Sequence, residues 1–158
     1  MLRVVDDSPL ALPRFVIQKH DATRMHYDLR LEIGGVLVSW AVPRGPSMDP
    51  AVKRLAVFTT DHDLAYADHE SERVIVWDAG RYTNLTGDSK GAVVPIAEGL
   101  ATGHVKVWLH GEKLEGAWAL TGTGGTQWLL VKVRDAAADP LADPVRDAPQ
   151  SIISGRTL

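Results

Sequence analysis

The stretch from His26 to Ile33 alternates strictly between polar and apolar residues. This period of two is typical of a β-strand that turns one face to a hydrophobic core and the other to solvent. Just upstream, Phe15–His20 has the composition of a second strand, and Asp21–Met25 is short enough to be the turn between them. Polar side chains could therefore converge across this reversal. They are His20, His26, Asp28 and Arg30.

Further short runs of β-branched and aromatic residues, separated by Gly and Pro, indicate more strands. The predicted strands are Phe15–Lys19, Tyr27–Ile33, Val36–Val42, Leu55–Thr59, Val74–Asp78, His104–His110, Gly116–Thr121 and Gln127–Arg134. Many short strands at close spacing favour an all-β, mostly antiparallel sandwich or small barrel. We expect helix only as short pieces, at Asp49–Arg54 and Val94–Thr102.

A chain of 158 residues is long enough for one domain with a real core. We expect a leader at residues 1–14, the folded domain at 15–135 and a tail at 136–158. The tail is rich in Ala, Asp and Pro, so it offers little apolar surface to stabilise a fold of its own. We therefore expect it to be extended or wrapped on the domain.

The sequence contains no cysteine, which excludes disulfides, thiolate metal sites and a cysteine nucleophile. It shows neither a signal peptide nor a run of membrane-spanning length, so we expect a cytoplasmic protein without membrane contact. The net charge of −3 argues against non-specific coating of nucleic acid. Residues 14–60, however, hold seven basic and four acidic side chains, a local balance of +3 that suits a phosphate-bearing substrate.

A second polar cluster, Asp61 to Tyr66, follows the predicted strand Leu55–Thr59. Together His20, Asp28 and His62 offer two imidazoles and a carboxylate, a ligand set that suits manganese or zinc. The spacing alone is equally consistent with a metal site and with an ordinary solvated strand face, because no such spacing is diagnostic in the way that paired Cys-x-x-Cys motifs are.

Three further side chains suit phosphate chemistry. His26 would stand beside the metal as a phosphate donor or a proton carrier. The guanidinium groups of Arg30 and Arg54 can bind two phosphate oxygens at once. The sequence thus suggests a phosphate site next to a metal site.

Several stretches closely resemble the 3'-phosphoesterase domain of bacterial ligase D, the end-joining DNA ligase. The first, from Phe15 to Glu32, is the most specific. The others are Ser39 to Pro50, Lys53 to Val57, Asp61 to Asp68, Gly111 to Gly116 and Trp128 to Asp135. The resemblance covers residues 15–135 and identifies the chain as a member of that family, and we expect a stand-alone version of the domain.

The resemblance implies a small closed β-barrel with a few short helices and a concave polar face. It also implies a manganese-dependent hydrolase of DNA repair by non-homologous end joining, which removes a 3'-terminal ribonucleoside and then the 3'-phosphate, leaving a 3'-hydroxyl. Zn²⁺ or Co²⁺ are the other candidate ions. Carried over by motif, the metal ligands are His20, Asp28 and His62. The catalytic phosphate site comprises Gln18, His26, Arg30, Arg54 and Tyr66.

The resemblance also implies partners, namely DNA or DNA/RNA 3' ends and, in trans, an end-joining ligase or polymerase. We expect a monomer. The chain departs from the family in three places: Thr60 replaces an acid, no Gly-rich insertion separates Asp68 from Val74, and the acidic and basic N-terminal arm has no match in Met1–Pro13.

These departures leave two alternatives open. One is a catalytically weak or inactive relative that binds DNA ends or an end-joining partner. The other, more remote, is an enzyme for a phosphoester that is not part of a nucleic acid.

Overall fold

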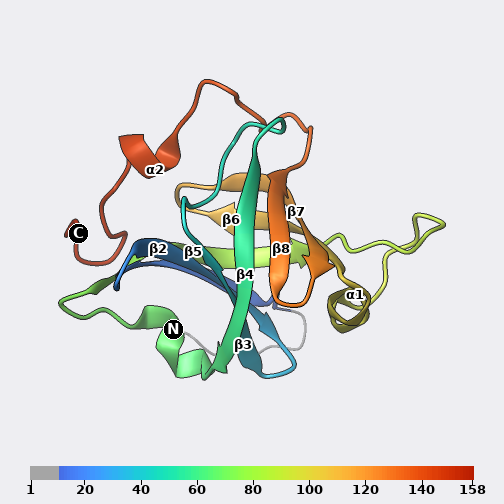
Figure 1. The fold of residues 1–158 in the computed structure, drawn as a ribbon, viewed down its shortest axis with the longest axis horizontal. Coiled ribbons are helices and arrows are strands. Elements are labelled where there is room, and N and C mark those ends of the chain that lie inside the picture. The colour runs from blue at the N-terminus through green and yellow to red at the C-terminus, as the bar shows by residue number, and fades with distance from the viewer. Residues whose placement is uncertain (1–10) are drawn as a thin grey trace.

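Eight antiparallel strands close into a barrel in the computed structural model, which describes residues 11–158 (Figure 1). Around the barrel the strand order is β1-β2-β3-β4-β8-β7-β6-β5, and β5 pairs back onto β1. The all-β prediction is confirmed, and of the two architectures left open by strand spacing the barrel is the one formed. The strands are β1 (Arg14–Asp21), β2 (Met25–Ile33), β3 (Val36–Val42), β4 (Lys53–His62), β5 (Val74–Asn84), β6 (His104–Gly111), β7 (Glu115–Gly124) and β8 (Gln127–Lys132).

The interior of the barrel takes one face of each strand. On β2 the apolar members of the alternation, among them Leu29 and Leu31, are buried in the core, as the period of two predicted. Aromatic rings fill much of the remaining space, and the ring of Trp40 packs edge to face against both Phe58 and Trp128. The polar residues of β2 are thereby forced onto the outer face of the sheet.

Strand β5 closes the barrel because it changes partner along its length. The part from Val74 to Arg81 pairs with β1 and the part from Gly80 to Asn84 pairs with β6, so the two pairings overlap at Gly80 and Arg81. Gly80 lies at the change, where a β-carbon would stand 2.0 Å from the carbonyl oxygen of His110. Only glycine permits this close approach of the two backbones.

Helical structure is scarce, as expected. Helix α1 (Ile96–Thr102) falls within the predicted segment 94–102. The other predicted piece, one helical turn at Asp49–Arg54, forms only as a single hydrogen-bonded turn: the Val52 amide donates to the Asp49 carbonyl, and β4 already begins at Lys53. Pairing of β4 with β8 thus overrides the local helix signals. A short 3-10 helix, η2 (Leu64–Asp68), was not expected.

The C-terminal segment 136–158 wraps back over the barrel (Figure 1, red). It contains one helical turn, α2 (Pro144–Asp147). Beyond α2, the Ala148 carbonyl accepts a 2.8 Å hydrogen bond from the Trp77 indole, and the Ile152 amide donates a 3.0 Å bond to the Val76 carbonyl. The segment is therefore bonded to β5. Most of the predicted leader, residues 1–14, lies outside the described residues.

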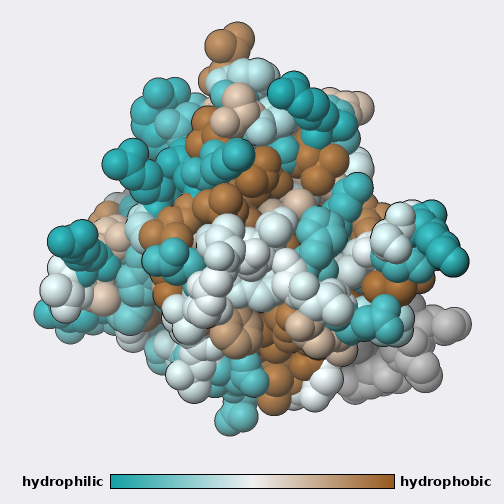
Figure 2. Space-filling view, turned by 45° about the vertical axis from the view of Figure 1, so that its right-hand side comes forward, coloured by the Kyte–Doolittle hydropathy of each residue, from teal (hydrophilic) through white to brown (hydrophobic). Residues whose placement is uncertain are grey.

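The outer surface over β4 and β8 is only partly polar. Leu55 of β4 is 43% exposed, and its cross-strand partner Leu129 on β8 is half-buried. Figure 2 shows apolar residues gathered in the upper middle of the view, neutral residues below them and hydrophilic residues scattered around both. Among the described residues, no helix has the length and hydropathy needed to cross a membrane.

Asp78 of β5 fastens the connection between β6 and β7 to the barrel. Its fully buried carboxylate accepts hydrogen bonds from three backbone amides, at 2.9 Å from Glu112, 3.1 Å from Lys113 and 2.9 Å from Leu114. Buried amides without an acceptor are costly, so this one side chain determines the path of the connection.

Asp78→Ala should therefore lower the free energy of unfolding by about 3 kcal/mol or more, because it leaves three amides without an acceptor. Urea unfolding followed by tryptophan fluorescence measures the change. Asp88→Ala is the matched control, since Asp88 also accepts from two backbone amides but on an exposed turn, where water can replace it. Equal losses in the two variants would contradict this account of Asp78.

Candidate active site

A pocket of about 340 Å³ opens on the outer face of β1 to β4, beside η2. Histidine, aspartate and arginine side chains line one side of the pocket, and small or neutral side chains line the other. Its lining residues are His20, His26, Asp28, Arg30, Ala41, Thr59, Thr60, His62 and Tyr66. Residues far apart in the sequence thus share one cavity.

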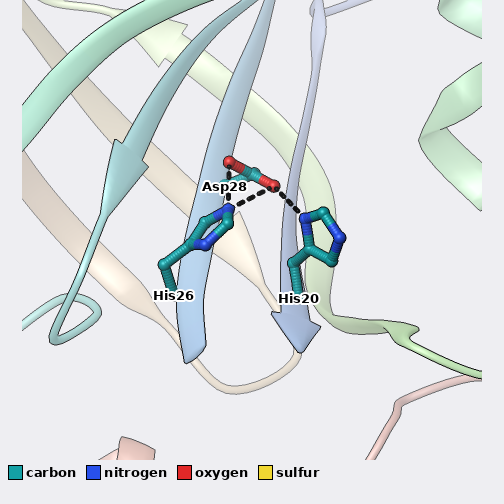
Figure 3. A group of neighbouring side chains, drawn as sticks. All are labelled: His20, His26 and Asp28. Atoms are coloured by element: carbon teal, nitrogen blue, oxygen red, sulfur yellow. Dashed lines mark hydrogen bonds and ion pairs between the residues drawn. The ribbon is translucent and has the colours of Figure 1, made fainter. Parts of the chain in front are cut away.

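The pairing of β1 with β2 brings two histidines and an aspartate together. His20 lies directly opposite His26, and Gln18 opposite Asp28. The Asp28 carboxylate lies 3.1 Å from His26 Nε2 and 3.7 Å from His20 Nδ1, as Figure 3 shows. The turn predicted between the two strands therefore produces the convergence that their alternation suggested.

This group fits a divalent metal ion. One ligand atom from each of His20, His26 and Asp28 can be chosen so that all lie within 4.8 Å of one another. Two ligands that each bind an ion at about 2.1 Å are separated by about 3 to 4 Å. The two contacts of Asp28 already lie in that range, and imidazole with carboxylate is a donor set that manganese and zinc accept.

Arg30 is a buried cation next to this group, with only 4% of its side chain exposed. Its Nη2 atom lies 3.3 Å from the Asp28 carboxylate, its Nε donates at 2.7 Å to Gln18 Oε1, and its Nη1 donates at 2.8 Å to Ser39 Oγ. A buried guanidinium needs such partners to offset the loss of hydration. The contacts fix the direction in which the charge points.

Gln18 connects Arg30 to η2. Its side chain is fully buried, and while its oxygen accepts from Arg30, its amide nitrogen donates to the carbonyls of Tyr66 at 2.9 Å and His69 at 3.1 Å. Gln18 therefore holds the guanidinium and the 3-10 helix in a fixed relation. Its contacts make it a positioning residue.

His62 and Tyr66 form the side of the pocket opposite the metal-binding group. His62 Nδ1 lies 3.1 Å from Arg30 Nη1 and 3.1 Å from the Thr60 carbonyl. The Tyr66 ring lies 4.6 Å from the His62 ring, centroid to centroid, and the Arg30 guanidinium carbon lies 5.1 Å from the Tyr66 centroid. Arg30 thus contacts both halves of the pocket.

The charges of the site are coupled. Burial raises the pKa of Asp28, but the hydrogen bond from His26 and the charge of Arg30 outweigh it and hold this pKa below its ordinary value. The hydrogen bond to Asp28 raises the pKa of His26. Burial lowers the pKa of Arg30, an effect that the charge of Asp28 opposes. The carboxylate therefore stays ionised near neutral pH.

Most of the side chains predicted from the sequence meet here, and Gln18 lies behind the lining. Arg54 does not line this pocket; it lines two other cavities, near the Pro43–Pro46 loop and the C-terminal segment. The sequence analysis missed Ser39, which binds Arg30. A signal existed, because Ser39 is the only polar residue in an otherwise apolar strand and its register places it opposite Arg30.

Comparison with known families gives one match over most of the chain. The model of the DNA ligase D 3'-phosphoesterase domain matches residues 18–122, which include Gln18 and every lining residue of the pocket. The region that the family model matches therefore contains the site described here.

Curated relatives carry the same family name. The multifunctional non-homologous end joining protein LigD of Pseudomonas aeruginosa is 47% identical over 93% of this chain. The LigD proteins of Mycobacterium tuberculosis and Mycolicibacterium smegmatis are 41% and 40% identical, each over 77% of the chain. The chain spans less than a fifth of the length of these relatives, 18%, 16% and 17% respectively.

The coupling of His26 and Asp28 predicts a pH-dependent contribution to stability. A raised histidine pKa stabilises the fold below the ordinary value of 6.5 and ceases to do so as the pH rises through the folded-state pKa. A lowered aspartate pKa stabilises it above 3.8 and ceases as the pH falls. The pair should therefore contribute most between these two values.

We expect Asp28→Asn to lower the pKa of His26, which a ring-proton NMR titration in metal-free buffer measures. The same variant should lose more thermal stability at pH 5 than at pH 8, relative to the parent protein. An unchanged His26 titration would show that the contact with Asp28 does not govern its pKa.

Proposed function

Because the chain belongs to the DNA ligase D 3'-phosphoesterase domain family, we propose that it is a manganese-dependent phosphoesterase that heals 3' ends in end joining. It would remove a terminal ribonucleoside and then the remaining 3'-phosphate, leaving a 3'-hydroxyl. One observation carries the proposal: two histidines and a carboxylate meet beside a buried arginine in a single pocket.

We assign the metal to His20, His26 and Asp28, because these three residues have ligand atoms close enough to share one ion. The sequence assigned His62 in place of His26. In this proposal the two histidines exchange roles, because the group of described residues whose ligand atoms lie within 4.8 Å of one another contains His26 and not His62. Manganese is the proposed ion, with Zn²⁺ or Co²⁺ as substitutes that the same donors accept.

A bound ion of this kind would polarise a phosphate oxygen and lower the pKa of a water molecule. The protein supplies the rest. Arg30, held rigid by its buried partners, offsets the negative charge that develops on the phosphate oxygens. When His62 Nδ1 accepts from Arg30, the ring proton resides on Nε2, from which His62 can donate to a phosphate oxygen or to the leaving 3'-oxygen.

One observation favours a second candidate function, a catalytically weak relative that binds DNA ends or an end-joining partner. Only residues 69–73 connect η2 to β5, at the place where the family resemblance leads us to expect an insertion. Such a protein would bind DNA ends in a salt-sensitive manner but turn over no 3'-modified end with manganese, zinc or cobalt. Competition between DNA and small phosphoesters separates both candidates from an enzyme for non-nucleic phosphoesters.

With manganese, the purified protein should convert a 3'-phosphate primer end to a 3'-hydroxyl. His20→Ala, Asp28→Ala and Arg30→Ala should each lower the rate by about 100-fold or more, because each removes a metal ligand or the fixed positive charge. Gel analysis of labelled primers measures the conversion, and excess chelator should abolish it.

The matched control for these variants is His104→Ala. His104 is an exposed histidine at the start of β6, outside the lining of the pocket. It should retain the parent rate. Activity that persisted in His20→Ala and Asp28→Ala would overturn the assignment of the site.

The exchange of roles between the two histidines has its own test. His26→Ala should weaken manganese binding at least tenfold, measured by electron paramagnetic resonance of the free ion, because it removes a ligand. His62→Ala should bind manganese about as well as the parent protein and yet lose turnover. The reverse result would restore His62 as the ligand and His26 as the phosphate contact.

A further inference from the structure

The C-terminal turn, residues 151–156, lies against the connection between η2 and β5, residues 69–73. The Ser151 amide closes the turn with a 2.8 Å hydrogen bond to the Arg156 carbonyl. In Figure 1 this last part of the chain, in red, and the connection, in green, lie at the same side of the barrel. The turn lies outside residues 18–122, which the family model matches, so the family assignment gives it no role.

A buried hydroxyl joins the turn to the connection. Ser151 is 3% exposed, and its Oγ atom accepts hydrogen bonds from the amides of Ile153 at 2.9 Å and Ser154 at 3.0 Å. The same hydroxyl donates to the carboxylate of Glu70, whose side chain is 14% exposed. That carboxylate also accepts a 2.7 Å bond from the Val76 amide. Glu70 is therefore bonded both to the turn and to β5.

Arg156 holds the two ends of the connection together. Its Nη2 atom donates at 2.6 Å to the Ser71 carbonyl and at 3.4 Å to the Val74 carbonyl, and it lies 3.9 Å from the Glu70 carboxylate. Burial raises the pKa of Glu70, but the hydrogen bonds from Ser151 and from the Val76 amide outweigh it and lower this pKa. The carboxylate is thus ionised near neutral pH and attracts the guanidinium.

Ile152 extends the contact to η2 itself. Its amide donates at 3.0 Å to the Val76 carbonyl, and its side chain packs against a small apolar cluster beside the main core. Leu64 and Tyr66 of η2 pack against the same cluster. The buried members of the cluster are Val16, Leu37, Ala67 and Val76. The C-terminal turn and the 3-10 helix therefore share one apolar support.

The connection leads directly to the rings of the catalytic pocket. Glu70 follows His69, whose carbonyl accepts from the buried Gln18 side chain. The His69 ring stacks on the Tyr66 ring, with centroids 4.5 Å and planes 19° apart, and the Tyr66 ring lies 4.6 Å from the ring of His62. A displacement of Glu70 would therefore move the His69 ring and, with it, the wall of the pocket.

We propose that Ser151, Ile152 and Arg156 are positioning residues for the reaction. They hold the connection in place and thereby keep the Tyr66 ring beside the Arg30 guanidinium, which it contacts at 5.1 Å. This inference rests on the proposed function. None of the three residues lines the pocket, so they act on the reaction only through η2. The C-terminal segment is then part of the catalytic apparatus as well as of the fold.

The proposal predicts that turnover and metal binding respond differently. Arg156→Ala and Ser151→Ala should each lower kcat on a 3'-phosphate primer by roughly tenfold, because small displacements of positioning groups are costly in rate. Manganese affinity, measured by electron paramagnetic resonance of the free ion, should stay at the parent value, since the assigned ligands lie on β1 and β2. Circular dichroism verifies that each variant is folded at the assay temperature.

Arg146→Ala is the matched control. Arg146 is an exposed arginine of the same C-terminal segment, and its ion pairs go to Asp143 and Asp147 beside it in sequence. The variant loses an arginine and its ion pairs but no contact with the connection. It should therefore keep the parent kcat. A loss in Arg146→Ala equal to that in Arg156→Ala would overturn the proposal.

A double-mutant cycle separates positioning from mere stabilisation. If the turn acts through Tyr66, Arg156→Ala should lower kcat in the parent background but not in Tyr66→Ala, where the ring to be positioned is gone. The loss of thermal stability caused by Arg156→Ala should be present in both backgrounds. Losses of kcat that add in the double variant would show that the turn does not act through Tyr66, and the inference would fail.

Ring-proton NMR in metal-free buffer gives a readout that does not depend on activity. The signals of His69 report its stacking on Tyr66, so Arg156→Ala should shift them and Arg146→Ala should not. Unchanged His69 and Tyr66 signals in Arg156→Ala would overturn the inference even if the parent protein is active. A parent protein that hydrolyses no 3' end, with His69 signals that still respond to Arg156→Ala, would instead overturn the proposed function.

Discussion

The site depends on keeping one charged side chain, Arg30, out of water. A guanidinium at 4% exposure is tolerable only because a carboxylate, an amide oxygen and a hydroxyl meet its donors. These partners come from β1, β2 and β3, so these three strands must pair in the correct register before the site exists. Gln18 also donates a hydrogen bond to the Tyr66 carbonyl, so the same group of contacts holds η2 in place. Fold and site are therefore stabilised by the same contacts.

Much of the barrel could be predicted from the sequence, because alternating polar and apolar residues and a β-branched composition indicate a strand that faces a core. The stretch from His26 to Ile33 predicted β2 and its polar face. The errors arose where tertiary pairing overrides local signals. Asp49 and Pro50 have the chemistry of a helix start, yet pairing with β8 takes the chain into β4 at Lys53. The 3-10 helix η2 is held by Gln18, which is remote in sequence, so no local sequence pattern predicted this helix.

The sequence predicted which residues form the site better than it predicted how these residues are arranged. Polar residues on one strand face must lie together, which brought His20, His26 and Asp28 into one group. The position of His62 depends on an irregular register between β3 and β4, at Leu37 and Ser39, that no single-strand pattern encodes. Arg54 shows a similar limit: its residue type indicates phosphate chemistry, but the cavity that it lines follows from how the chain closes around it.

Closure of the barrel also limits how the protein can associate. Each of the eight strands has a partner on both sides over part of its length, so only short segments, such as the start of β5 and the end of β4, lack a partner strand for their amides and carbonyls on one side. Association by strand addition is thereby disfavoured, and contact with other proteins has to use side-chain surfaces, such as the one that exposes Leu55 on β4. The same topology protects the protein against edge-to-edge aggregation.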